Sequence, residues 1–331
     1  MYTLSNIGTH TVSGTYALDV HRTAAGIASI SSDQSLSLLD PSRLRAGPFV
    51  RLLTGHGNVS SLRVYDWGSS VVCTAGENGS VGVWDLRAGS KVAQFAASQK
   101  PILSLACNSA TNTIAVGTEL QDHTASVLLW DVRSTPTSRA QYDEVHSDDV
   151  TSLTFHPSEP AYLMSGSTDG LVNVYDTRIA DEDEVILQTF NHNASIHHAA
   201  FLTDTHVLAL SHDEQCALYD MADDNPSGDA AQHFGDLRQG LGCQYVANVS
   251  PKADGTGVIL GAGAQENSQQ GFELVFLTKG ESAWAFDRSS SVGLPGAHGE
   301  EIVRAFCFID EDQVVITAGE DGSVKAWRPS S

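Results

Sequence analysis

The chain has 331 residues, of which 41% are hydrophobic and 18% are charged, so it is long enough to bury a substantial core. Its 40 acidic residues outnumber its 18 basic residues, which gives a formal net charge of −22 at pH 7. A charge of that sign attracts basic proteins and repels phosphates and anionic lipid, so we expect no direct binding to nucleic acid or to membranes.

The sequence carries no pattern typical of secretion or membrane insertion. No apolar run is long enough for a transmembrane helix, and residues 1–14 lack the basic and apolar regions of a signal peptide. The five cysteines are scattered and form no CxxC pair, which favours buried free thiols over disulfides or a zinc site. We therefore expect a soluble protein of the cytoplasm, the nucleus or both, without a cofactor.

Short apolar stretches that end in aspartate recur along the chain at nearly constant spacing. They end at Asp40, Asp85, Asp131, Asp176 and Asp220, so the successive steps are 45, 46, 45 and 44 residues. A period of this length, with Trp-Asp endings and Gly-His pairs upstream, is typical of the blades of a β-propeller.

Taken in chain order, these repeats predict seven units of four short strands separated by turns rich in Gly, Asn, Asp and Ser. The units begin near residues 14, 55, 100, 146, 196, 244 and 296, and the last one ends at Trp327. The third unit has a lengthened turn at 118–126, and the sixth lacks a Trp-Asp ending. The last unit has room for three strands, so Tyr2, Leu4 and Ile7, or Val12, are expected to supply its outer strand and close the ring.

Two connections between these units are predicted to be long, acidic surface loops. They span residues 177–195 and residues 221–236. Loops of this length lie on the surface and often carry function.

The chain resembles the WD-repeat family over its whole length, most specifically at residues 146–176 and 296–329. The first segment reads HSDDVTSLTFHPSEP and then SGSTDGLVNVYD, and the second begins GAHGEE and ends KAWRP. The resemblance implies an all-β fold: one seven-bladed β-propeller domain over residues 1–331, built from four-stranded antiparallel blades. It also implies a non-enzymatic interaction protein that is monomeric outside its complexes.

In that family, a His, a Ser or Thr, an acid and an aromatic residue form a buried hydrogen-bonded tetrad in each blade. The corresponding residues occur in the second, fourth and seventh units, with Asn78 in place of the usual Asp and Tyr175 in place of the usual Trp: His56, Thr74, Asn78 and Trp84; His146, Ser165, Asp169 and Tyr175; and His298, Thr317, Asp321 and Trp327. An imidazole that is hydrogen-bonded on both nitrogens exposes no nucleophile, so these residues are expected to be structural rather than catalytic. A metal site is not expected at His197 and His198 either, because adjacent side chains on a strand point to opposite faces.

Arginine follows three of the repeat aspartates at the second position. The segments WDLR, WDVR and YDTR place these residues at Arg87, Arg133 and Arg178. They resemble the WDxR box of propellers that serve as substrate receptors of cullin-RING ubiquitin ligases, which implies contact with a ligase adaptor. The alternative is structural, because a guanidinium can also tie a strand end to a neighbouring acidic group.

Acidic residues in turns and connections of the third to sixth units are expected to gather on one face and to bind a partner. The residues of this predicted face are Glu119, Asp122, Asp181, Glu182, Asp183, Glu184, Asp213, Glu214, Asp223, Asp224 and Glu266. The leading hypothesis is a scaffold or escort for a basic protein segment, such as a ribosomal or histone-like tail. The second is a ligase substrate receptor, and the third is an enzyme that uses a central channel.

Overall fold

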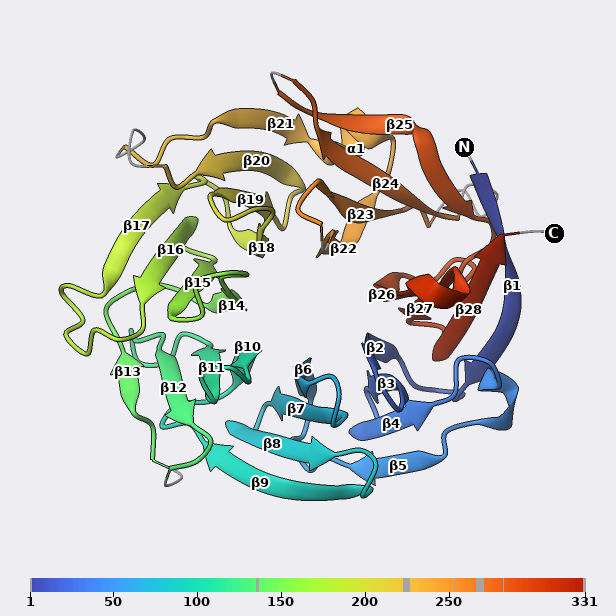
Figure 1. Ribbon diagram of the computed structural model, residues 1–331, viewed down its shortest axis with the longest axis horizontal. Helices are drawn as coiled ribbons and strands as arrows, with labels where there is room; N and C mark the ends of the chain where they lie inside the picture. Colours follow the sequence, from blue (N-terminus) through green and yellow to red (C-terminus); the bar gives the residue numbers. More distant parts are fainter. Residues whose placement is uncertain are drawn as a thin grey trace. The chain divides into compact units, whose positions relative to one another are not determined.

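The computed structural model describes residues 2–134, 137–222, 227–252, 254–265, 271–281 and 283–329. These residues form an all-β fold (Figure 1). The chain divides into two compact units. Unit 1 comprises Met1–Val72, Trp84–Lys91 and Leu241–Ser331, and unit 2 comprises Cys73–Val83 and Val92–Gly240.

Unit 1 contains an eight-stranded sheet and a four-stranded sheet. The larger sheet has the order β22 (Tyr245–Pro251), β23 (Gly257–Gly263), β24 (Phe272–Lys279), β25 (Trp284–Leu294), β1 (Tyr2–Thr11), β28 (Ser323–Pro329), β27 (Val314–Gly319) and β26 (Val303–Ile309). The smaller sheet has the order β2 (Ala17–Thr23), β3 (Gly26–Ser31), β4 (Ser35–Leu39) and β5 (Val50–Leu53).

Strand β1 joins the last two groups of strands into the single eight-stranded sheet. It pairs antiparallel with β28 from Leu4 opposite Pro329 to Thr11 opposite Ser323, as predicted for the outer strand of the last unit. It also pairs in parallel with β25 at Tyr2 and Thr3. The two last groups are therefore not separate four-stranded sheets, because β1 hydrogen-bonds to both (Figure 1).

Unit 2 contains three complete four-stranded antiparallel sheets. The first is β10 (Ile102–Asn108), β11 (Thr113–Thr118), β12 (Val127–Asp131) and β13 (Ala140–Tyr142). The second is β14 (Val150–Phe155), β15 (Tyr162–Ser167), β16 (Leu171–Asp176) and β17 (Ile186–Asn191). The third is β18 (Ile196–Phe201), β19 (His206–Ser211), β20 (Gln215–Asp220) and β21 (Gln232–Asp236).

One further four-stranded sheet and three short helices complete the described elements. The sheet has the order β6 (Val59–Asp66), β7 (Val71–Gly76), β8 (Ser80–Asp85) and β9 (Ser90–Ala96). The helices are the 3₁₀ turns η1 (Leu44–Ala46) and η2 (Asp310–Asp312) and the α-helix α1 (Leu237–Leu241). Within the described ranges, no helix has the length and apolarity needed to cross a membrane.

The core of each unit is formed by strands that are buried along nearly their whole length, such as β4, β11 and β27. In unit 1, Ile27, Leu39 and Ile316 are at most 1% exposed and share one cluster. In unit 2, Val150 and Tyr175 are fully buried in another. Burial falls toward the outer strands, since β21 alternates between half-buried and exposed residues along its length.

The repeat aspartates mark strand ends as predicted. Asp85, Asp131, Asp176 and Asp220 are the last residues of β8, β12, β16 and β20, and Asp40 directly follows β4.

The prediction that residues 177–195 and 221–236 connect separate units is wrong. Each segment contains the outer strand of its own sheet, because β17 pairs with β16 and β21 pairs with β20. Asp181 to Glu184 therefore lie in a hairpin loop within one sheet. Asp223 and Asp224 lie outside the described residues.

Candidate partner-binding surfaces

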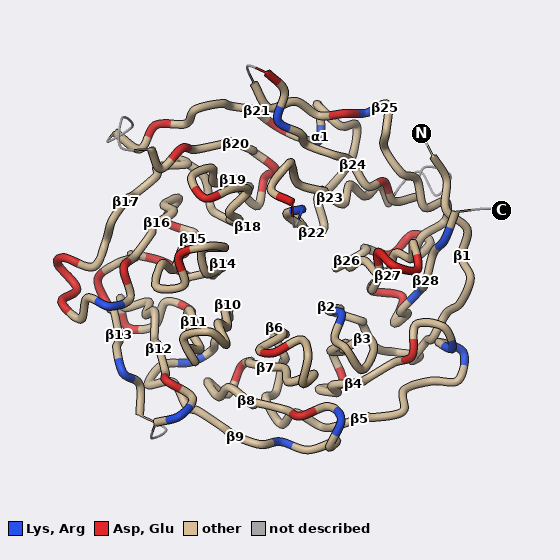
Figure 2. Tube along the Cα trace, in the orientation of Figure 1, with Lys and Arg blue, Asp and Glu red and all other residues tan. Residues whose placement is uncertain are grey.

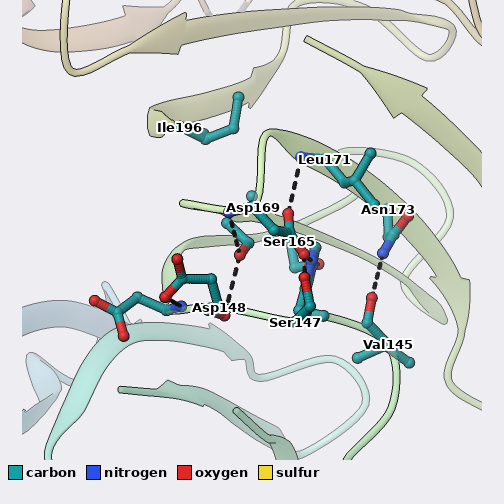
Figure 3. A network of polar contacts seen from close by, with 12 residues as sticks. Val145, Ser147, Asp148, Ser165, Asp169, Leu171, Asn173 and Ile196 are labelled. Atoms are coloured by element: carbon teal, nitrogen blue, oxygen red, sulfur yellow. Dashed lines mark hydrogen bonds and ion pairs between the residues drawn. The ribbon is translucent and has the colours of Figure 1, made fainter. Parts of the chain in front are cut away.

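The fourth repeat forms the expected tetrad in unit 2. His146 Nδ1 lies 2.9 Å from Asp169 Oδ2, and His146 Nε2 lies 2.6 Å from Ser165 Oγ. The hydroxyl groups of Ser165 and Tyr175 are also hydrogen-bonded to each other. Figure 3 shows how the surrounding backbone joins this network, with the amides of Ser147 and Leu171 donating to the Asp169 carboxylate at 3.0 and 2.9 Å.

The chemistry of this tetrad is that of a structural clamp. Burial opposes ionisation of Asp169, but the hydrogen bond and charge of His146, together with the backbone amides of Leu171 and Ser147, outweigh it, so the pKa of Asp169 lies below its usual 3.8. Burial raises the pKa of the Tyr175 hydroxyl above its usual value. The carboxylate therefore stays ionised and the phenol stays protonated, and the side chains of His146 and Ser165 are fully enclosed.

The seventh repeat forms the same arrangement in unit 1, with Thr and Trp in place of Ser and Tyr. His298 lies 2.6 Å from Asp321 through Nδ1 and 2.7 Å from the Thr317 hydroxyl through Nε2. Trp327 Nε1 donates to the same hydroxyl at 2.9 Å. Burial lowers the pKa of His298, and this effect outweighs the opposing effect of Asp321.

In the second repeat, the two units each hold part of the expected set. His56 and Trp84 lie in unit 1 and Thr74 and Asn78 lie in unit 2. His56, Thr74 and Trp84 are at most 3% exposed, whereas Asn78 is exposed and accepts hydrogen bonds from the amide and hydroxyl of Ser80. Their association in one tetrad stays a prediction.

Two repeats without the sequence signature contain substitutes for the tetrad. In the third, Gln99 Oε1 accepts hydrogen bonds from the hydroxyls of Thr118 at 3.1 Å and Ser126 at 2.9 Å. In the fifth, His192 Nδ1 lies 3.0 Å from the Tyr219 hydroxyl. Neither repeat has a Gly-His pair at this place, so the tetrad motif does not predict these contacts.

The arginines of the WDxR segments turn back onto the aspartate two residues earlier. Arg133 donates two hydrogen bonds to Asp131, and Arg178 donates two to Asp176, at distances of 2.5 to 3.0 Å. Arg87 makes a looser contact, with its Nε 3.8 Å from Asp85.

The same fork recurs where no WDxR segment exists. Arg238 binds Asp236 at 2.9 and 2.8 Å, a pair that the Trp-Asp pattern could not find but that an Asp-x-Arg search would have found. The geometry is thus a local property of an Asp-x-Arg sequence at a strand end. The Arg87, Arg133 and Arg178 side chains remain 57%, 66% and 67% exposed.

The structure does not bring the predicted acidic face together. Glu119 and Asp122 lie in the β11–β12 loop and Asp213 and Glu214 lie in the β19–β20 turn, which are connections between second and third strands. Asp181 to Glu184 lie between a third and a fourth strand, at the opposite end of an antiparallel sheet from such a turn. In addition, Glu214 is only 6% exposed, so it cannot serve as a surface contact. Glu266, like Asp223 and Asp224, lies outside the described residues.

A more compact acidic group forms around Glu182 instead. The backbone amide of Glu144 donates to Glu182 Oε1 at 2.5 Å, which brings the β16–β17 loop against the end of β13. The Tyr142 hydroxyl donates to the carbonyl of Ile179 at 3.0 Å and fixes the same loop. We define the outer acidic patch as Asp143, Glu144, Asp181, Glu182, Asp183 and Glu184; Figure 2 shows acidic residues gathered along the loop between β16 and β17.

The outer acidic patch concentrates like charge. Partial burial raises the pKa of Glu182 above its usual value, and the nearby carboxylates of Asp143 and Glu144 raise it further. Arg and Lys side chains of the described residues form ion pairs with acids elsewhere, and none of those pairs includes a residue of the patch. A positive group from another molecule would relieve this repulsion.

The histidines of β18 differ from the sequence expectation in one respect. A bulge between Ile196 and His198 breaks the alternation, so the rings of His197 and His198 lie 4.0 Å apart, and His197 also stacks on His212 at 4.9 Å. Among the described residues, no group of three or more His, Cys, Asp or Glu side chains is placed to hold a metal ion.

Three segments of the chain match a known family model, and the fold matches a solved structure. The family model described as "WD domain, G-beta repeat" matches residues 47–85, 137–176 and 290–328. These are the second, fourth and seventh repeats, in which the tetrad residues are complete in the sequence. Over its full length the fold matches a chain of the crystal structure of a mitotic checkpoint complex, with a TM-score of 0.74, 17% identity and 94% of that chain covered.

Relatives in other organisms place the chain in its family, and the chain spans less than two thirds of the length of two of them. It is 34% identical over 287 residues to an uncharacterised WD repeat-containing protein of Schizosaccharomyces pombe, covering 82% of this chain and 83% of the relative. It is 35% identical over 252 residues to one of Saccharomyces cerevisiae, covering 75% of this chain and 61% of the relative. A WD repeat-containing protein 89 homologue of Dictyostelium discoideum is 27% identical over 253 residues, with 76% of this chain and 65% of the relative covered. The chain belongs to the WD repeat-containing proteins, and its fold is propeller-like.

Proposed function

We propose that this WD-repeat protein is a non-enzymatic scaffold or escort that binds a basic segment of another protein through the outer acidic patch. The observation that carries the proposal is the hydrogen bond from the Glu144 amide to Glu182, which brings acidic residues together at a place where the described part of the chain forms no ion pair with them. The proposed binding site is therefore smaller than the acidic face predicted from the sequence, and it consists of the β16–β17 loop and the end of β13.

The charge of the whole chain supports this choice of partner. A net charge of −22 raises the local concentration of cationic molecules and speeds their association. A localised acidic patch within that field adds orientation to the attraction. Ribosomal or histone-like tails, in the cytoplasm or nucleus, have the complementary chemistry.

The outer acidic patch lies on a fold of repeated four-stranded groups. The 28 described strands form one eight-stranded and five four-stranded sheets, which corresponds to seven groups of four. We propose that these groups form one seven-bladed domain over residues 1–331, closed by β1. Such a domain offers a rigid frame on which exposed loops bind partners.

Affinity purification from native extract at low and high salt, followed by mass spectrometry, tests the proposal. We expect basic proteins to be retained at low salt and released at high salt, because exposed charge pairs are screened. Retention of neutral or acidic partners that is insensitive to salt would contradict it.

A second candidate function is that of a ligase substrate receptor. It is favoured by the exposure of the Arg133 and Arg178 side chains, which are 66% and 67% accessible. Charge reversal at Arg87 and Arg178 should then abolish co-purification of a cullin adaptor and leave the melting temperature nearly unchanged. Wild-type protein that recovers no adaptor would exclude this function.

A further inference from the structure

One tryptophan differs from the other four in its exposure. Trp84, Trp130, Trp284 and Trp327 are at most 4% exposed, whereas Trp67 is 51% exposed. The core therefore does not require the Trp67 ring. Exposed tryptophans are otherwise concentrated at protein interfaces, where they contribute much of the binding energy.

The backbone that carries Trp67 is held firmly in the turn between β6 and β7. Its carbonyl accepts hydrogen bonds from the amides of Ala24 at 3.1 Å and Ser70 at 3.2 Å. The preceding carboxylate, Asp66, accepts from the amide of Gly68 at 3.1 Å and from the Ser69 hydroxyl. An aromatic side chain on such a turn loses little freedom when a partner binds it.

Trp67 already interacts with one cation of its own chain. The guanidinium carbon of Arg22 lies 5.5 Å from the centre of the ring, within the range of a cation–π contact. Arg22 is also paired with Glu311 in η2. The Trp67 ring thus already forms a contact with a guanidinium, the type of group that a basic partner would supply.

The residues on either side of Glu311 add two negative charges to η2. Asp310 and Asp312 are exposed members of η2, and no ion pair among the described residues includes either one. Because Arg22 neutralises Glu311, these two carboxylates remain available to a second cation. Figure 2 shows the acidic stretch of η2 next to β26 and β27.

We propose that Trp67 and η2 form a docking point for a lysine or arginine side chain of an extended basic segment from a partner protein. The cation stacks on the exposed part of the Trp67 ring and pairs with Asp310 or Asp312. This inference rests on the proposed function in the nature of the partner, but it assigns a separate contact point on unit 1.

Tryptophan fluorescence tests the inference directly, because Trp67 is the accessible member of the five. Quenching of the free protein should be stronger with Cs⁺ than with I⁻, since the surrounding carboxylates attract cations. A peptide of alternating Gly and Arg should lower the acrylamide quenching constant by about twofold by covering the ring. Binding of the same peptide is followed separately by calorimetry.

Matched variants separate local charge from total charge. Asp310→Asn with Asp312→Asn should abolish the protection of Trp67, whereas Glu300→Gln with Glu301→Gln should retain it. The control pair is exposed, and it precedes β26 while η2 follows that strand. Trp67→Phe should remove the quenchable fraction, which confirms the assignment of the signal.

The outcomes distinguish this docking point from the outer acidic patch. A peptide that binds without protecting Trp67 would overturn the inference and leave the proposed function intact. A peptide that protects Trp67 equally when Asp181 to Glu184 are neutralised would support the docking point alone. No binding in calorimetry would overturn both.

Discussion

His298 and Trp327 meet on one hydroxyl group, that of Thr317. The indole Nε1 donates to the Thr317 oxygen at 2.9 Å, and the hydroxyl in turn lies 2.7 Å from His298 Nε2. Asp321 accepts from the other ring nitrogen, so both nitrogens have a partner, and burial favours the neutral form of the imidazole by lowering the pKa of His298. A histidine used in this way connects the segment before β26 to β27 and β28.

His298→Ala should destabilise the protein by about 1 to 3 kcal/mol, since it leaves Thr317 and Asp321 without their shared partner. Thermal melting of this variant beside His233→Ala, whose side chain is exposed on β21, measures the difference. Equal midpoints for the two variants would reject the structural role of His298.

The same histidine makes stability depend on pH in a defined direction. Burial lowers the pKa of His298 in the folded protein below the usual 6.5, which we assign to the unfolded chain. At a pH between these two pKa values, the unfolded chain binds a proton at His298 and the folded chain does not. Stability from this group is therefore fully present above the usual pKa and falls as the pH decreases below it. The pKa of His192 is lowered by burial in the same way.

Denaturant titrations at neutral and mildly acidic pH test this sign. We expect a smaller free energy of unfolding at the lower pH, and a weaker dependence in His298→Gln, which cannot titrate. At still lower pH we expect a further loss of stability. The pKa values of Asp169 and Asp321 are depressed in the folded protein, so the stability that these carboxylates contribute is complete above their usual 3.8 and is lost as the pH falls toward the depressed values. An identical pH dependence in the wild type and the variant would contradict the assignment.

Two residues of β1 should lose very different amounts of stability when they are truncated to alanine. Leu4 is buried in the cluster that contains Phe272 and Trp327, so Leu4→Ala should cost about 2 to 5 kcal/mol. Ile7 lies at the bulge of the strand and is 45% exposed, so Ile7→Ala should be nearly neutral. Chemical denaturation of both variants gives the comparison, and a neutral Leu4→Ala would show that β1 does not hold the eight-stranded sheet together.

Much of the fold could be predicted from the sequence because the inner strands carry a strong repeated signal. Apolar stretches ending at Asp131 and Asp176 correspond to β12 and β16, and the tetrads of the fourth and seventh repeats have the predicted hydrogen bonds. The outer position of β1 also followed from the missing fourth strand in the last repeat.

The outer strands could not be predicted in the same way. The sequences ILQTFN and QHFGD of β17 and β21 bury few residues and resemble loops, so the acidic hairpin loop at Asp181 was assigned to the wrong connection. Parallel pairing of β1 with β25 involves only Tyr2 and Thr3, which is too short a contact to leave a pattern. The exposed ring of Trp67 had no signal either, since its neighbours Arg22 and Glu311 are distant in sequence.

The outer acidic patch is the central element of the proposed function, and one comparison of two variants tests it directly. The patch variant carries Asp181→Asn, Glu182→Gln, Asp183→Asn and Glu184→Gln. The control variant carries Asp122→Asn, Glu159→Gln, Asp204→Asn and Asp213→Asn, which removes the same charge from exposed residues elsewhere in unit 2.

The measurement is the association rate and affinity of both variants for a basic peptide as a function of salt concentration. The patch variant should bind roughly tenfold more weakly, mainly through slower association, and its salt dependence should be shallower. The control should stay close to wild type, and both should keep the wild-type melting temperature. Equal losses in the two variants would show that only net charge matters, and would contradict a localised binding site at Asp181 to Glu184.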